Sequence, residues 1–242
     1  MRAGEKIIKL IGTQRLILCL INFPCSISIL ARTVFSMTDL DRLSLDDIRQ
    51  RLSKQPDTTY DVPPEMLQGD TREAAVLIPF CRIDDAWHIL YIRRAKFEGD
   101  LHSGQVAFAG GKREAGDSSL EYTALREAEE EIGLAHQDVK VLGHLNHHHT
   151  ISDFIVRPYV AQVHWPYPLT LGEAEVAHAF TMPLTWLADQ SNYRTEQRQH
   201  PDSQRPWPVV YYEHYQGELL WGATARMTLS LIEVLTGEQG RR

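Results

Sequence analysis

Residues 126–134 read Arg-Glu-Ala-Glu-Glu-Glu-Ile-Gly-Leu and follow a glycine pair at positions 110 and 111. The stretch places four carboxylates within five positions. Apolar residues recur through the same region at helical spacing and can seat a helix over residues 119–132 against a core. Gly133 suits the left-handed position that ends such a helix. The stretch therefore predicts an amphipathic helix with a dense acidic face.

This acidic face predicts a metal site. At about 100° per residue, Glu127, Glu130 and Glu131 lie within about one third of the helix circumference, and Glu129 points to the other side. Carboxylates this close repel each other unless cations lie between them. Oxygen ligands at this density suit Mg²⁺ or Mn²⁺, which also take substrate phosphates as ligands. A solvated acidic helix is the alternative, but it does not require the flanking glycines.

The same residues resemble the signature of the Nudix hydrolases, G-x5-E-x7-R-E-U-x-E-E-x-G-U, in which U is aliphatic. Its second half matches residues 126–134, with the small Ala128 at an aliphatic position. In the first half, Asp117 stands where the signature has Glu, and the interval from Asp117 to Arg126 is one residue longer. The resemblance implies an α/β protein, a Nudix-type α/β/α sandwich around a mixed β-sheet, and metal-dependent cleavage of a diphosphate.

Further segments resemble Nudix enzymes that hydrolyse coenzyme A. They are 102–111, which precedes the helix, 175–184 and 221–227, and the resemblance extends from about Leu45 to Val234. It implies that coenzyme A or an acyl derivative is hydrolysed to 3′,5′-ADP and (acyl-)4′-phosphopantetheine.

The chain departs from this subfamily at several positions around the expected pocket. Ala109 replaces the usual proline, and residues 99–101 lack the usual Leu-Arg. Asp153 and Arg157 replace glycine and threonine, which changes the charge. These departures concern the choice of substrate more than the chemistry of the acidic helix.

The resemblance assigns roles to the helix residues. Glu127, Glu130 and Glu131 are expected to bind the metal. Glu130 is the preferred proton acceptor for a water whose pKa the cation lowers. Arg126 is expected to orient the glutamates through charge-assisted hydrogen bonds. Catalysis is therefore predicted to depend on Arg126, Glu127 and Glu130.

Substrate binding is predicted around the glycine turn. Gly110 and Gly111 let the backbone pass close to the metal and substrate. Arg93 and Arg94 precede this turn and are candidates to bind a phosphate. Glu175 is either an extra ligand or a surface residue. The run 147–149 consists of three histidines, which lack the spacing of a zinc site and are expected in a polar loop.

Composition narrows the class of protein. An apolar share of 43% is ample for a core, and a net charge of −7 disfavours nucleic-acid or stable membrane binding. The three cysteines, with no metal-ligand spacing, fit a reducing compartment, so a cytoplasmic location is expected. The expected partner is a small-molecule diphosphate, and the sequence leaves a homodimer open.

The chain is expected to divide into an N-terminal extension (1–36), a helix and loop (37–70), the Nudix domain (71–236) and a tail (237–242). The extension resembles a signal peptide or upstream translated sequence, and we favour Met37 as the start. The apolar patterns predict strands at 74–80, 87–92, 106–108, 139–145, 154–163 and 209–215, and helices at 45–52, 119–132, 183–188 and 222–235.

Three other functions remain compatible with parts of this pattern. A Nudix hydrolase of ADP-ribose, NADH or a nucleotide sugar would use the same helix on a different diphosphate. A catalytically silent Nudix-fold sensor would bind a ligand without turnover, although the retained Arg126 and glutamates argue against it. An RNA-end pyrophosphohydrolase is disfavoured by the acidic balance and the lack of a basic stripe.

Overall fold

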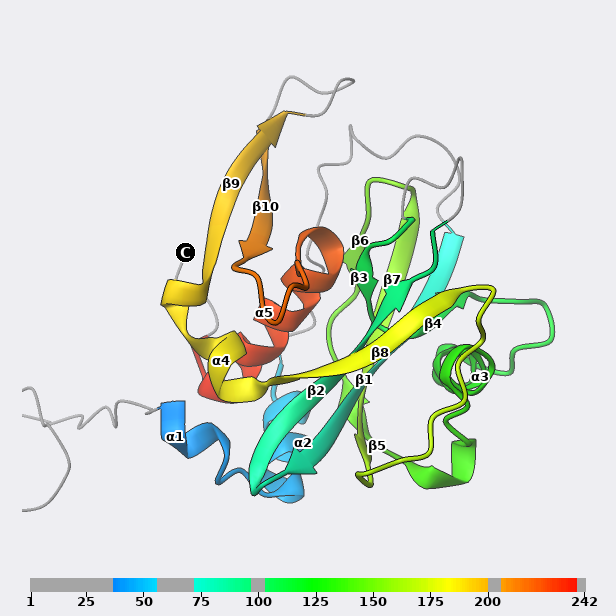
Figure 1. Cartoon of the computed structure of the whole chain (residues 1–242), viewed down its shortest axis with the longest axis horizontal. Helices are drawn as coiled ribbons and strands as arrows, with labels where there is room; N and C mark the ends of the chain where they lie inside the picture. The colour runs from blue at the N-terminus through cyan, green and yellow to red at the C-terminus, as the bar shows by residue number, and fades with distance from the viewer. Residues whose placement is uncertain (1–36, 56–71, 97–102, 200–205, 239–242) are drawn as a thin grey trace, which may run out of the picture. The chain divides into compact units, whose positions relative to one another are not determined.

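The computed structural model describes residues 37–55, 72–96, 103–199 and 206–238 (Figure 1). The chain divides into a unit at Met1–Val34 and a unit at Phe35–Arg242, and every described residue belongs to the second. The predictions for residues 1–36, the loop after residue 55 and residues 99–101 lie outside the described part. Within the described ranges, no helix is long and apolar enough to cross a membrane.

The helices and strands alternate along the chain. In order they are α1 (Met37–Leu40), α2 (Leu45–Ser53), β1 (Arg72–Ile83), β2 (Ala86–Arg94), β3 (Val106–Ala107), β4 (Gly110–Lys112), α3 (Leu120–Ile132), η2 (His136–Asp138), β5 (Val139–His144), β6 (His148–His149), β7 (Phe154–Val163), β8 (Val176–Pro183), α4 (Leu184–Ala188), η3 (Gln190–Asn192), β9 (Tyr193–Gln199), β10 (Pro206–Tyr212) and α5 (Gly222–Thr236).

The main sheet is mixed and has eight strands. Its central order is β3-β2-β1-β7-β5, with β4 on β1, β6 on β7 and β8 on β2. Strands β1 and β7 run parallel, whereas β1 pairs with β2 and β4 in antiparallel fashion. β9 and β10 form a separate two-stranded hairpin (Figure 1).

The sheet is buried on both faces because β1 alternates its side chains between two cores. Ile78 and Phe80 pack into the core that also contains residues of α2, α4 and α5. Ala75 and Leu77 pack into the second core, which α3 covers through Ala124, Ala128 and Ile132. Helices therefore lie on both sides of the sheet, which confirms the predicted α/β/α architecture (Figure 1).

The helix α3 has the two ends that its sequence predicts. Ser119 is extended and accepts a hydrogen bond from the Tyr122 N–H, so it caps the N-terminus. Gly133 adopts φ 69° and donates its N–H to Ala128 and Glu129 carbonyls. These caps fix the length of the helix and thereby the positions of its glutamates.

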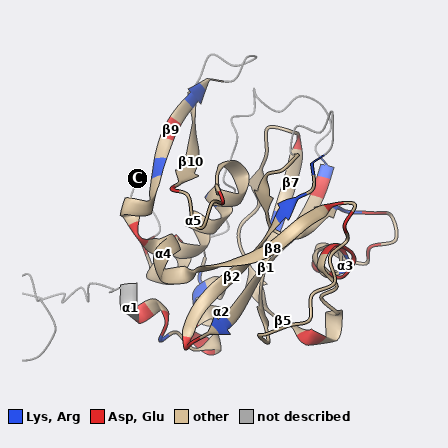
Figure 2. Cartoon of the chain, viewed as in Figure 1, with Lys and Arg blue, Asp and Glu red and all other residues tan. Residues whose placement is uncertain are grey.

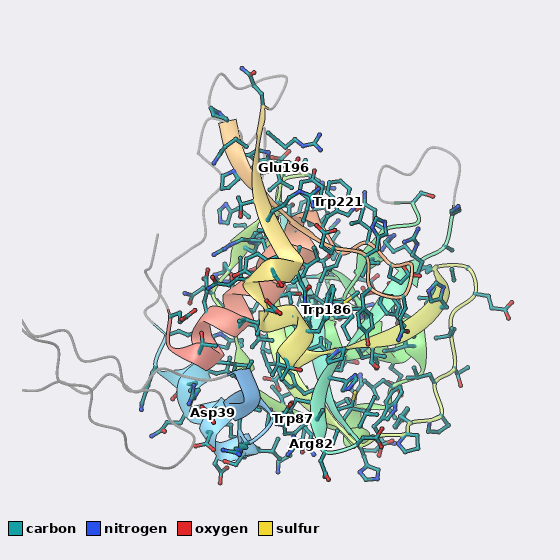
Figure 3. The ribbon with its side chains drawn as sticks, turned by 60° about the vertical axis from the view of Figure 1, so that its left-hand side comes forward. Asp39, Arg82, Trp87, Trp186, Glu196 and Trp221 are labelled. Carbon is teal, nitrogen blue, oxygen red and sulfur yellow. The ribbon has the colours of Figure 1, made fainter. Side chains whose placement is uncertain are left out.

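The segment 37–55 packs on the same unit as the sheet. The Trp87 indole donates to the Leu43 carbonyl at 2.9 Å, and the Trp87 N–H donates to the Asp41 carboxylate at 2.9 Å. The Arg82 guanidinium lies 4.4 Å from the Trp87 ring, and Figure 3 shows these two side chains close together. The N-terminal helices are thus part of the folded domain.

Four strands were not predicted from the sequence. β9 has mostly exposed residues, so the apolar alternation that marks a half-buried strand is missing. β8 was not identified within the stretch 175–184, and β4 and β6 are only three and two residues long. The prediction of a loop for 147–149 was wrong for β6, where His148 and His149 pair with Val156 and Ile155 of β7. Backbone pairing with β7 determines this conformation.

Candidate active site

The acidic face of α3 borders a cavity of about 260 Å³. The opposite wall comes from the loop that precedes β8. Figure 2 marks the acidic residues on and around α3 in red. The lining residues are Glu114, Arg126, Glu127, Glu130, Glu131, Gly172, Ala174 and Glu175. The structure therefore brings the predicted catalytic and metal-binding residues of α3 together on one wall.

Glu131 lies at the bottom of this wall and is only 3% exposed. Its carboxylate accepts a hydrogen bond from the Gly110 N–H at 2.9 Å. Burial raises the pKa of Glu131 to about 7, and the charges of Glu127 and Glu175 act in the same direction. A cation beside this buried carboxylate would stabilise its charged form.

Glu127 lies against the glycine turn. A Cβ atom built on Gly111 would lie 2.6 Å from the Glu127 Cδ and Oε1 atoms, so only glycine leaves room for this carboxylate. Burial raises the pKa of Glu127, and the neighbouring Arg126 opposes that effect. The close approach explains why the turn before the acidic helix requires a glycine at this position.

Arg126 connects the acidic residues to one another. Its guanidinium lies 2.9 Å from Glu127 and 2.8 Å from Glu130. It also pairs with Asp117 at 3.0 Å through Nε, and only 16% of its side chain is exposed. This geometry agrees with the predicted orienting role, because one planar guanidinium fixes three carboxylates at once.

Asp117, which stands where the Nudix signature has Glu, points toward Arg126. It also accepts hydrogen bonds from the Thr123 hydroxyl and from the Glu114 N–H, each at 2.9 Å. The Arg126 guanidinium holds the pKa of this carboxyl well below its usual range. The loop before α3 therefore contains a buried acidic residue that positions Arg126.

The cavity wall includes two further carboxylates that the sequence did not clearly assign to the site. Glu175 lines the cavity, and its charge raises the pKa of both Glu127 and Glu131. Glu175 is also exposed, so it borders the cavity from the solvent side. Glu114 was not predicted, because it lies outside the helical spacing that identified the others.

The two predicted phosphate-binding arginines occupy different environments. Arg93 pairs with Glu218 at 2.9 Å, and His178 contacts the same carboxylate at 2.9 Å. Arg94 lies close enough to Glu131 for its charge to lower the pKa of that carboxyl. Of the two arginines, Arg94 is therefore the one whose charge acts on the acidic wall of the α3 cavity.

The histidine run lies on the strand beside β7. Arg157 donates to His144 Nδ1 at 2.9 Å and to His147 Nε2 at 2.6 Å. Burial lowers the pKa of His148 to about 4. Among the described residues, no three Asp, Glu, His or Cys side chains are grouped closely enough to hold a metal ion, and this includes the histidines.

The donor chemistry of the cavity nonetheless fits a divalent cation. Glu127 and Glu131 are carboxylates with raised pKa values, and Glu175 adds charge of the same sign. Carboxylate oxygens are hard donors that suit Mg²⁺ or Mn²⁺, and a divalent cation would offset the repulsion between them. Glu130 forms an ion pair with Arg126, and its carboxylate would have to leave this arginine to bind a metal ion together with Glu127 and Glu131.

Comparison with known families identifies the architecture. A model of the NUDIX domain matches residues 71–205. The chain belongs to the Nudix family. Two bacterial relatives, both named "Uncharacterized Nudix hydrolase NudL", agree with this. The Photorhabdus laumondii protein is 35% identical over 191 residues, covering 79% of this chain and 97% of the relative. The Salmonella paratyphi B protein is 34% identical over 195 residues, covering 80% and 95%.

Solved structures of other Nudix proteins align with part of this chain at low sequence identity. An Ap4A hydrolase of C. elegans is 15% identical with a TM-score of 0.41, over 47% of this chain and 81% of that one. The Nudix hydrolase RenU of M. smegmatis is 20% identical with a TM-score of 0.42, over 50% and 76%. Family membership makes this Nudix protein a hydrolase of the pyrophosphatase type, as the sequence predicted.

Proposed function

We propose that this Nudix hydrolase cleaves the diphosphate of coenzyme A or acyl-coenzyme A to 3′,5′-ADP and (acyl-)4′-phosphopantetheine, with Mg²⁺ or Mn²⁺ as cofactor. The hydrolytic part of the proposal rests on one observation: the partly buried Glu127 and the buried Glu131 line the same cavity as Glu175, beside the glycine turn. Glu127, Glu130 and Glu131 would hold the ion. When bound, it would offset the charge of the diphosphate and lower the pKa of water at the site.

The side chains of the cavity have separate tasks in this proposal. Glu130 accepts the proton of the attacking water, because its side chain is 59% exposed and faces the cavity. Arg126 holds Glu127 and Glu130 in place from the side and is itself fixed by Asp117. The Gly110 N–H fixes the carboxylate of Glu131 at 2.9 Å. These contacts preorganise the acidic wall before the substrate binds.

The choice of coenzyme A is supported by the sequence segments around the site. In the structure some residues of these segments pack in the core. Phe108 stacks on Tyr91 at 4.9 Å, and the Tyr91 hydroxyl lies 3.0 Å from Thr228 of α5. These contacts concern packing, so the substrate needs a direct test. A cytoplasmic location and a homodimer stay predictions.

The test is hydrolysis of coenzyme A, 3′-dephospho-coenzyme A, ADP-ribose, NADH and UDP-glucose, each with Mg²⁺, Mn²⁺ or EDTA. Products are resolved by chromatography. We expect metal-dependent release of 3′,5′-ADP from coenzyme A with the highest kcat/KM. A higher kcat/KM for ADP-ribose, NADH or UDP-glucose would refute the choice of coenzyme A while keeping the hydrolase. Binding without turnover of any of the five would favour the silent sensor.

A further inference from the structure

A second cavity of about 420 Å³ lies beside the catalytic one, and Glu114 lines both. It lies between the start of β1 and the loop that joins β4 to α3. That loop contains the residue by which the chain exceeds the Nudix signature. The lining residues are Arg72, Glu73, Lys112, Arg113, Glu114, Ala115 and Asp117. Asp117, which stands where the signature has Glu, is thus part of the wall of this cavity.

The charges of this cavity are only partly neutralised. Arg113 forms an ion pair with Glu73 at 2.7 Å, and Asp117 forms one with Arg126 at 3.0 Å. Within the described ranges, no carboxylate lies within 4.0 Å of the charged groups of Arg72 or Lys112. Arg72 and Lys112 thus line this cavity without an acidic partner among the residues that the structure describes.

Strand register brings these two cations together although they are far apart in sequence. Lys112 of β4 pairs with Ala74 of β1, and Arg72 lies two residues before Ala74. Side chains alternate along a strand, so Arg72 and Lys112 lie on the same face as diagonal neighbours, about 7–8 Å apart between backbones. Two like charges at this spacing repel unless an anion lies between them.

The Arg72 guanidinium is held in position for such an anion. It donates to the Ser152 carbonyl at 2.9 Å and lies 4.1 Å from the Phe154 ring. These contacts engage one Nη2–H donor and one face of a group that has five N–H donors. The remaining donors can bind phosphate oxygens, for which the guanidinium fork is suited.

We propose that this cavity binds a phosphate monoester of the substrate, separate from the diphosphate that is cleaved, with Arg72 and Lys112 as its ligands. The inference rests on the proposed function, in which the phosphate is the 3′-phosphate of the nucleotide. Glu114 lines both cavities, so they share a wall. Arg72 and Lys112 share the sheet face of Ala74, whereas α3 covers the face of Ala75, so in this proposal the nucleotide reaches past Glu114 from the diphosphate site to the 3′-phosphate site. Arg72 and Lys112 then determine the preference for a 3′-phosphorylated substrate.

The test measures binding as well as activity, on the full chain. Isothermal titration compares 3′,5′-ADP with 5′-AMP, which lacks only the 3′-phosphate, for wild type, Lys112→Ala, Arg72→Ala and the control Lys140→Ala. Lys140 lies on β5 and lines neither cavity. We expect wild type to bind 3′,5′-ADP about tenfold or more tightly than 5′-AMP, as one phosphate contact of about 1.4 kcal/mol requires.

Lys112→Ala and Arg72→Ala should each reduce this ratio severalfold, and Lys140→Ala should keep it. The kcat/KM ratio of coenzyme A to 3′-dephospho-coenzyme A should fall in parallel. A wild-type ratio near one, or an unchanged ratio in both cavity variants, would overturn the inference. If wild type cleaves neither coenzyme, the proposed function fails, but the binding ratios still decide whether this cavity recognises a 3′-phosphate.

Discussion

The contact between Gly111 and Glu127 gives the sharpest prediction about the acidic wall. In Gly111→Ala the new Cβ would lie 2.6 Å from the Glu127 carboxylate, whereas ordinary contact begins at 3.4 Å. The carboxylate must therefore move by 3.4 − 2.6 = 0.8 Å or more. Glu127 is a flexible side chain and the Gly111 backbone is not left-handed, so the fold should tolerate this change.

A displacement of this size is large for a catalytic group. Misplacing a reacting or metal-binding group by about 1 Å can lower a rate by about 10²-fold. We therefore expect Gly111→Ala to lower kcat by about 10- to 100-fold and to raise the Mg²⁺ concentration needed for half-maximal activity. The unfolding midpoint should change by only a few degrees, because the clash is with a movable side chain.

Two glycines nearby provide matched controls. A Cβ on Gly116 would meet nothing within 4 Å, so Gly116→Ala in the same loop should keep both activity and stability. Gly110 has φ 156°, and its Cβ would lie 2.4 Å from the Ala75 carbonyl, so Gly110→Ala should destabilise the fold itself. Steady-state kinetics and thermal unfolding of all three variants separate these effects. Wild-type kcat and metal dependence in Gly111→Ala would refute the reasoning.

Three further changes test other parts of the site and core. Glu130→Gln should lower kcat by about 10²-fold or more. The free energy of unfolding should change little, because the Glu130 side chain is largely exposed. Near-normal turnover would show that Glu130 has no catalytic role. Asp117→Asn should cost about 3 kcal/mol in denaturant unfolding, because it breaks a buried ion pair. The pKa of Asp117 in the folded protein lies below its ordinary value of 3.8, so the ion pair contributes its full stabilisation above that pH. This contribution is lost as the pH falls further. If wild type and Asp117→Asn differed in unfolding free energy by the same amount at pH 7 and at pH 3, this account would be wrong. Thr228→Val should lower the free energy of unfolding by about 1–3 kcal/mol, because it leaves the buried Tyr91 hydroxyl without its hydrogen-bond partner. If the effects of Thr228→Val and Tyr91→Phe simply add in the double mutant, the two side chains do not interact.

The elements that the sequence predicted well are those with a local physical cause. The caps of α3 depend on Ser119 and Gly133 alone, and Gly133 has the left-handed φ of 69° that the sequence predicted for the end of this helix. Asp153 stands where the related segment has glycine, and its φ of 60° shows why glycine suits that position. Each of these features is set within a few residues.

The parts that escaped sequence reasoning depend on contacts between distant segments. The acidic face of α3 was predictable from helical periodicity, but the approach of Glu114 and Glu175 to it was not. Arg93 and Arg94 are adjacent in sequence, yet strand β2 sends the first to Glu218 and the second toward Glu131. Arg72 and Lys112 meet only through the register of β1 and β4. Strand pairing, which a single sequence encodes weakly, determines these positions.

The most direct test of the central claim is hydrolysis of coenzyme A in ¹⁸O-labelled water, with Mg²⁺ or with EDTA, followed by mass spectrometry of the products. We predict that 3′,5′-ADP and 4′-phosphopantetheine appear only with the metal and that a single ¹⁸O enters the phosphate of one of them. Loss of label and product in a Glu127→Gln, Glu131→Gln double variant would tie the reaction to the acidic wall. Equal product with EDTA, or no product from wild type with metal, would contradict the claim.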